Sequence, residues 1–156
     1  MRIALGCNHE GHEFVARLGE WMAKTSFAGI DVLEITALQR VDSQSLEDYP
    51  RFARGVCQGL MVGDYHRGIL VGTSGVGMSI TANRFPRVRA VLCNDCFTAA
   101  MSRRWNDANV LVLGSHAVTM EMAQQVVRVW LETPFEGGRY QELVDHINQP
   151  VDVGFG

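Results

Sequence analysis

Residues 67–84 read RGILVGTSGVGMSITANR, and this stretch decides the fold. Its apolar run at 69–71 has no polar alternation, which is typical of a strand that is covered on both faces. Glycines at 72, 75 and 77 then predict a tight loop that opens a helix. Such a loop can hold an anion, present a nucleophile or simply turn the chain.

The same alternation of apolar runs and helical patterns fills the whole chain. Strands are predicted at 2–7, 30–35, 68–72, 88–93 and 109–114, and helices at 10–24, 49–62, 77–84, 96–104, 119–132 and 138–148. This order predicts a single α/β domain over residues 1–156, with a three-layer, doubly wound (Rossmann-like) sheet of five parallel strands. In such sheets, ligands bind beyond the carboxyl ends of the strands, which directs attention to the loops there.

The composition points to a globular protein without a basic surface. Of 156 residues, 47% are hydrophobic and 20% are charged, and the net charge is −3. These values argue against disorder and nucleic-acid binding, and no apolar run is long enough for a membrane span. We therefore expect a cytoplasmic protein with no nucleic-acid or membrane partner. The four cysteines are Cys7, Cys57, Cys93 and Cys96.

Metal and redox sites receive no support from these cysteines. Cys93 and Cys96 form a C-x-x-C pair, but a zinc ribbon needs a second pair, and the chain has none. We interpret the pair as two reduced thiols near a strand end. The histidines and cysteines lack the spacing of metal ligands, so no metal is predicted.

The glycine-rich loop fails three familiar motifs. It has the glycine and serine spacing of a nucleotide P-loop, but Met78 stands where the lysine is required. A dinucleotide fingerprint fails at Ile80, and a nucleophile elbow fails at Val76. What remains is a loop in which glycines such as Gly75 and Gly77 let backbone N–H groups hold a negative oxygen, with a purely structural turn as the alternative.

Six segments, in this order and spacing, carry a resemblance to a known family. They read IALGCNHEG, DYPRFA, GILVGTSGVGMSITANR, VRAVLCND, RRWNDANVLVLGS and TPFEGGRYQ. Over almost its whole length, the chain resembles the ribose-5-phosphate isomerase B / galactose-6-phosphate isomerase family. The resemblance implies aldose–ketose interconversion of a sugar phosphate through an enediolate, without a cofactor. It also implies a homodimer in which the partner chain completes each site.

The resemblance assigns roles to two sets of residues. The implied catalytic set is Ser74, Gly75, Gly77, His9 and Asn106. The implied substrate-binding set is Asn8, Tyr49, Gly72, Thr73, Val76, Met78, Trp105, His116, Arg139 and Tyr140. For Tyr49, packing at a helix start stays open as an alternative, and for His9 a solvated loop position does.

The chain departs from the family pattern at the positions that move protons. Most relatives carry a cysteine base where this chain has Gly72, and relatives without it carry a glutamate where this chain has Met78. The family's aspartate before the histidine is Asn8. The sequence leaves open which group replaces the base; the candidates are His9, His116, Cys7 and Cys96.

The positions that recognise substrate depart as well. The family's ring-opening histidine is Trp105, whose indole can stack on a flatter or less polar ligand. Among its phosphate-binding arginines only Arg139 is matched; other positions hold His116 and Leu143, and Tyr140 replaces a histidine. Fewer arginines mean fewer charge-assisted contacts to a dianion. We therefore expect ribose 5-phosphate to be a poor substrate.

Two alternatives to the isomerase stay open. One is a protein that binds a sugar phosphate without turnover, and the other is a different reaction through an enol, such as dehydration or epimerisation. For the loop itself, we expect a side chain at Gly75 to abolish ligand binding while leaving the fold nearly intact.

Overall fold

A single parallel sheet forms the centre of the molecule. The computed structural model describes residues 1–31, 34–38 and 49–150. The strands are β1 (Arg2–Cys7), β2 (Glu34–Leu38), β3 (Arg67–Gly72), β4 (Ala90–Leu92) and β5 (Val110–Gly114), in the spatial order β2-β1-β3-β5-β4. All neighbouring pairs are parallel, which confirms the predicted doubly wound α/β class. The strand expected at 30–35 lies further along the chain, at β2, and residues 32–33 are outside the described part.

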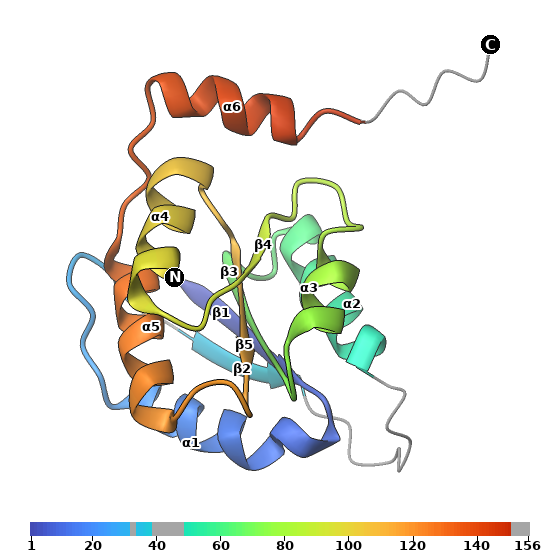
Figure 1. The fold of residues 1–156 in the computed structure, drawn as a ribbon, viewed down its shortest axis with the longest axis vertical. Coiled ribbons are helices and arrows are strands. Elements are labelled where there is room, and N and C mark those ends of the chain that lie inside the picture. The colour runs from blue at the N-terminus through green and yellow to red at the C-terminus, as the bar shows by residue number, and fades with distance from the viewer. Residues whose placement is uncertain (32–33, 39–48, 151–156) are drawn as a thin grey trace.

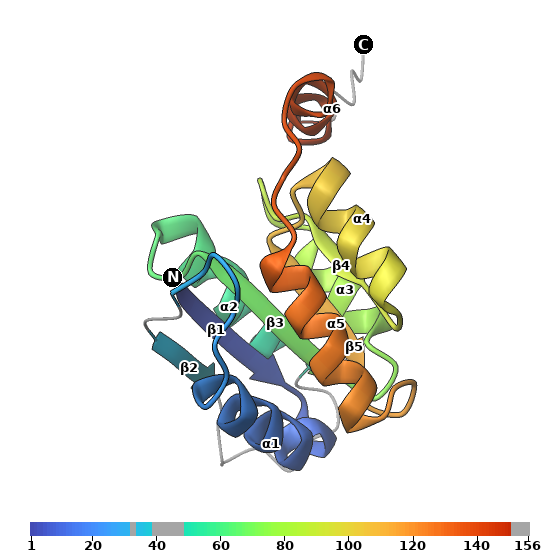
Figure 2. The same cartoon turned by 90° about the vertical axis from the view of Figure 1, so that its left-hand side faces the viewer.

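Helices cover both faces of this sheet (Figures 1 and 2). One face carries α1 (His12–Ala23), α4 (Cys96–Asn106) and α5 (Met120–Glu132), and the other carries α2 (Tyr49–Val62) and α3 (Val76–Ala82). Successive residues of β1 serve the two layers in turn, because Ile3 and Leu5 join the first core and Ala4 joins the second. This double burial explains why the strands read as continuous apolar runs.

Local capping sets where the helices after β4 and β5 begin. The Asp95 carboxylate accepts a hydrogen bond from the Thr98 N–H at 2.7 Å, and the Thr119 hydroxyl accepts one from the Met122 N–H at 3.2 Å. Each side chain satisfies a backbone donor that the first helical turn leaves free. Both helices therefore start within one residue of the predicted positions.

The last helix, α6 (Arg139–Ile147), projects from the body (Figures 1 and 2). It lies against α4, and Val144 is its buried residue. Leu143 and Ile147 are 53% and 55% exposed, so an apolar stripe of this helix faces away from the rest of its own chain. Among the described residues, no helix is both long and apolar enough to cross a bilayer.

Candidate active site

The topology creates a crevice between β1 and β3. The chain leaves β1 toward α1 on one face of the sheet and leaves β3 toward α3 on the other, so the two loops separate at the carboxyl edge. The register places Cys7 beside Val71, so both loops begin at the same level. A pocket of about 320 Å³ lies there, within the size range of small-molecule sites.

Most of the residues predicted from the strand ends line this pocket. Asn8 comes from the loop after β1, and the others come from the end of β3 and the glycine-rich loop. The predicted residues that line it are Asn8, Gly72, Thr73, Ser74, Gly75, Gly77 and Met78. The structure thus brings together residues more than 60 positions apart, and the crevice is where the strand-end rule predicts a ligand.

A chain of hydrogen bonds crosses the crevice. The Asn8 side chain accepts from the Gly11 N–H at 3.1 Å, which fixes its oxygen there and leaves its amide as a donor. That amide donates to the Thr73 hydroxyl at 3.3 Å, and the hydroxyl donates to the Glu10 carboxylate at 2.5 Å. Glu10 also lines the pocket. Glu10 was not predicted as a site residue, although it lies in the segment IALGCNHEG directly after the predicted Asn8 and His9.

Gly75 also has a structural role in the fold. Its φ is +77°, in the left-handed region that favours glycine, and it precedes the first residue of α3. An added Cβ would lie 2.6 Å from Leu92 Cδ1 and 3.0 Å from the Leu113 carbonyl oxygen. The missing side chain therefore makes room for the protein's own core. The expectation that a side chain at Gly75 spares the fold is wrong, because it would strain the backbone and displace packed atoms.

The other predicted residues near this edge surround the pocket. His9 is exposed in the short 3-10 helix η1 (His9–Gly11), with its ring edge-on to His12. His116 is exposed, and its backbone N–H donates to the Thr73 carbonyl at 3.1 Å, which ties the loop after β5 to the site. Val76 is 48% exposed at the start of α3. Tyr49 begins α2, and its side chain lies outside the described residues.

The candidate cysteine bases differ in access. Cys7 is fully buried, and burial raises the pKa of its thiol to about 11. Cys96, the other candidate, is half-buried at the start of α4. A base needs its thiolate form, so Cys7 is unsuited to the task at neutral pH. All four cysteines are free.

The remaining predicted residues form a second cluster. The rings of Trp105 and Tyr140 are stacked, with centroids 6.0 Å apart and planes 20° apart. The Arg139 guanidinium lies 4.8 Å from the centroid of the Tyr140 ring and donates to its hydroxyl at 2.8 Å. One face of the indole that was predicted to stack on a ligand is thus covered by Tyr140.

These two clusters lie at opposite ends of the same chain. Because the strands are parallel, α4 starts at the carboxyl edge with Cys96 and runs back to the amino edge, where Trp105 and Asn106 lie. Eleven helical residues span about 16 Å. In Figure 1 the strand arrowheads point to the lower end, whereas α6, which begins with Arg139, lies at the upper end. One chain therefore does not bring all predicted residues into one pocket.

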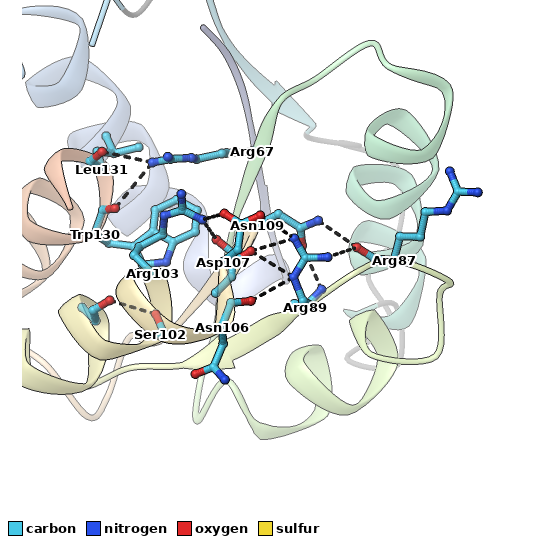
Figure 3. A network of polar contacts seen from close by, with 12 residues as sticks. Arg67, Arg87, Arg89, Ser102, Arg103, Asn106, Asp107, Asn109, Trp130 and Leu131 are labelled. Atoms are coloured by element: carbon cyan, nitrogen blue, oxygen red, sulfur yellow. Dashed lines mark hydrogen bonds and ion pairs between the residues drawn. The ribbon is translucent and has the colours of Figure 1, made fainter. Parts of the chain in front are cut away.

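A network of arginines holds the end of α4 in place (Figure 3). Asp107 has a left-handed φ of 46° and accepts from Arg103 at 2.7 Å and from Arg89 at 2.9 Å. The Arg89 Nε also donates to the Asn106 carbonyl at 3.0 Å, so the network fixes that residue's backbone. Figure 3 shows the exposed Asn106 side chain pointing away from the arginines.

Arg67 extends the network to α5. Its guanidinium donates to the carbonyls of Trp130 and Leu131, at 3.4 and 3.1 Å, and lies 5.2 Å from the centroid of the Trp130 ring. A cation at the last carbonyls of α5 also interacts favourably with the negative end of the helix dipole. Burial, with the nearby Arg103 charge, lowers the pKa of Arg67 to about 10, so it stays charged at neutral pH.

A second pocket, of about 350 Å³, lies at the amino edge of the sheet. Its lining includes Tyr65, His66, Arg87 and Asn109. It is not at the carboxyl ends of the strands, so the rule for α/β sheets assigns the ligand to the crevice instead. Within the described part of the chain, no three histidine, cysteine or acidic side chains gather in a way that could hold a metal ion.

The fold and crevice define a class of α/β proteins that bind small polar molecules beyond a parallel sheet. Comparison with known proteins narrows this class. The family model for ribose/galactose isomerases matches residues 3–147. The chain therefore belongs to the ribose/galactose isomerase family, as the resemblance implied.

Individual relatives agree with this assignment. Ribose-5-phosphate isomerase B of Escherichia coli is 39% identical over 150 residues, covering 94% of this chain and 93% of that protein. D-erythrulose-4-phosphate isomerase of Pectobacterium atrosepticum is 35% identical over 99 residues, covering 64% of this chain and 65% of that protein. The solved ribose-5-phosphate isomerase B of Clostridium thermocellum has a TM-score of 0.86 and 33% identity, over 95% of each chain.

Proposed function

We propose that this protein interconverts the aldose and ketose forms of a sugar phosphate through an enediolate. The observation that carries the proposal is the crevice between β1 and β3, in a chain of the ribose/galactose isomerase family. Ser74, Gly75 and Gly77 line this crevice. Backbone N–H groups of this loop would stabilise the enediolate oxygen, since charge that develops there needs fixed donors.

We further propose that the working unit is a homodimer with a shared site. The crevice holds Asn8 and the glycine-rich loop, while Trp105, Asn106 and Arg139 lie at the other end of the chain. A two-fold arrangement brings the end of one chain to the crevice of the other. The exposed apolar side chains of α6 support this, because a partner would bury them. Arg139 would then bind the phosphate.

The proposed substrate is a sugar phosphate other than ribose 5-phosphate. Gly72 has no side chain and Met78 is buried and cannot ionise, so neither supplies a base. Trp105, packed on Tyr140, offers no acid or base for ring opening. A substrate that is already open-chain would need no ring opener. The relative named D-erythrulose-4-phosphate isomerase supports a shorter substrate, since tetrose phosphates cannot close a ring through the phosphorylated oxygen.

The second candidate function is binding without turnover. The absence of an ionisable side chain at both Gly72 and Met78 favours it.

The free cysteines in the described residues fit a reducing compartment, which supports cytoplasmic action for either candidate.

The test uses a panel of sugar phosphates of three to six carbons. Thermal shift first identifies the compounds that bind, and NMR in D₂O then follows ketose formation and deuterium incorporation next to the carbonyl. Turnover at about 1 per second or faster, with exchange, supports the isomerase. Binding without exchange supports the second candidate. Fast turnover of ribose 5-phosphate would contradict the proposed substrate preference.

A further inference from the structure

We propose that Glu10 is the base that moves the proton between the two carbons of the substrate. This inference rests on the proposed function and assigns its proton-transfer step to a side chain. Among the described residues that line the crevice, Glu10 is the one with an ionisable carboxyl group; the others are Asn8, Gly72, Thr73, Ser74, Gly75, Gly77 and Met78. A carboxylate is a competent base for a hydrogen next to a carbonyl.

The position of the carboxylate is defined by its neighbours. Thr73 follows the last residue of β3 directly, and its hydroxyl donates to Glu10 Oε2 at 2.5 Å. This hydrogen bond ties the exposed Glu10 side chain to the end of β3, in the same pocket as Gly72. Because the hydroxyl occupies Oε2, the other carboxylate oxygen is left to accept a proton from the substrate.

Asn8 makes this arrangement consistent. A hydroxyl has one proton to give, and the Asn8 amide donates to Thr73 Oγ1 at 3.3 Å, so that proton is free to go to Glu10. A carboxylate at position 8 would compete for the same proton and would also place a second negative charge nearby. The amide at 8 and the carboxylate at 10 thus form a matched pair, which the loop joins through Thr73.

The proposed step conserves atoms and electrons. In the aldose, Glu10 removes the hydrogen on C2, and the electrons of that C–H bond form the C1=C2 double bond while the carbonyl electrons move to O1. The protonated carboxyl then returns this proton to C1. The hydroxyl proton of O2 moves to O1, which leaves the ketone at C2. No oxidant or other reactant is needed, and the reverse sequence forms the aldose.

The experiment compares Glu10→Gln with the wild type on the best substrate of the panel. The amide keeps the size of the side chain but cannot accept the proton, so we expect kcat to fall about 10²- to 10⁴-fold, with KM changed far less. Deuterium exchange next to the carbonyl should fall by the same factor. Glu13→Gln is the matched control, because Glu13 is exposed three residues further on and lies in the first turn of α1. It should leave kcat within about twofold.

A second variant separates chemistry from folding. In Glu10→Ala, added formate should restore part of kcat in proportion to its concentration, since a small carboxylate can occupy the vacated space; circular dichroism and thermal midpoint report the fold. If the wild type isomerises a substrate and Glu10→Gln keeps kcat within about threefold of it, Glu10 is not the base, while the proposed function stands. A wild type that isomerises no sugar phosphate would instead overturn the proposed function.

Discussion

At the scale of single residues, the orientation of the Glu10 carboxylate in the crevice depends on the hydroxyl proton of Thr73. Asn8 and Glu10 both contact the Thr73 hydroxyl, one as donor and the other as acceptor. In Asn8→Asp, an acceptor replaces that donor while the cap to the Gly11 N–H is retained, since aspartate serves as an N-cap equally well. We expect kcat to fall about tenfold with little change in thermal midpoint, because the Glu10 carboxylate loses its fixed orientation.

Asn94→Asp is the control for this prediction, because Asn94 is exposed in another loop at the same edge of the sheet and the change adds the same charge. It should leave kcat nearly unchanged. An increase in kcat for Asn8→Asp would show that position 8 works as a carboxylate in this chain, against the matched pair of Asn8 and Glu10.

At the scale of elements, the turn after α4 depends on Asp107. The Asp107 carboxylate pairs with Arg103, which is only 5% exposed, and with Arg89. Removing this carboxylate leaves the buried Arg103 cation without its ionic partner. We expect Asp107→Ala to lower the free energy of unfolding by about 2–3 kcal/mol, below the value for a fully buried pair because the Asp107 side chain is 34% exposed. Urea denaturation measures this. Asp64→Ala, at an exposed position, should change it by less than about 0.5 kcal/mol.

The elements were predictable from sequence because most of their signals are local. Apolar runs gave the strands, and caps such as Asp95 and Thr119 set helix starts within one residue. The site was predictable only in part. The contact between Thr73 and Glu10 joins residues 63 positions apart, and no local pattern encodes it. The tight packing around Gly75 against Leu92 and Leu113 is equally non-local, so no local pattern shows that the core also requires a glycine there.

At the scale of the whole molecule, three buried thiols link stability to alkaline pH. Burial raises the pKa of Cys7 to about 11 and the pKa values of Cys57 and Cys93 to about 12, from 9.0 in the exposed group. At a pH between 9 and the pKa of a thiol in the folded protein, that thiol is deprotonated in the unfolded chain and protonated in the folded chain. Stability is therefore intact below pH 9 and falls above it.

As the pH rises from 9 to about 10, we expect the free energy of unfolding to fall by about 1 kcal/mol for each of these thiols. Urea denaturation at several pH values measures the total. Cys57→Ala removes one of the three thiols. Between pH 9 and pH 10, the free energy of unfolding of this variant should therefore fall by about 1 kcal/mol less than that of the wild type. Equal slopes for the variant and the wild type would contradict the burial argument.

The division of predicted site residues between two ends of the chain yields a test with mixed dimers. Glu10→Gln damages the crevice, and Arg139→Ala damages the other end. In a heterodimer of the two, one shared site collects both substitutions and the other collects none. Random mixing after refolding should therefore restore about a quarter of the wild-type kcat/KM per chain, although each variant alone is nearly inactive.

The control for mixing is a double variant, Glu10→Gln with Arg139→Ala in one chain, refolded together with wild type. Its heterodimers carry one defect in each shared site, so mixing should leave only the activity of the wild-type homodimers, about a quarter of the value for an all-wild-type sample. Static light scattering gives the mass of each preparation. If each single variant is inactive and dimeric and the two fail to complement, each site is built within one chain, and the proposed shared site is wrong.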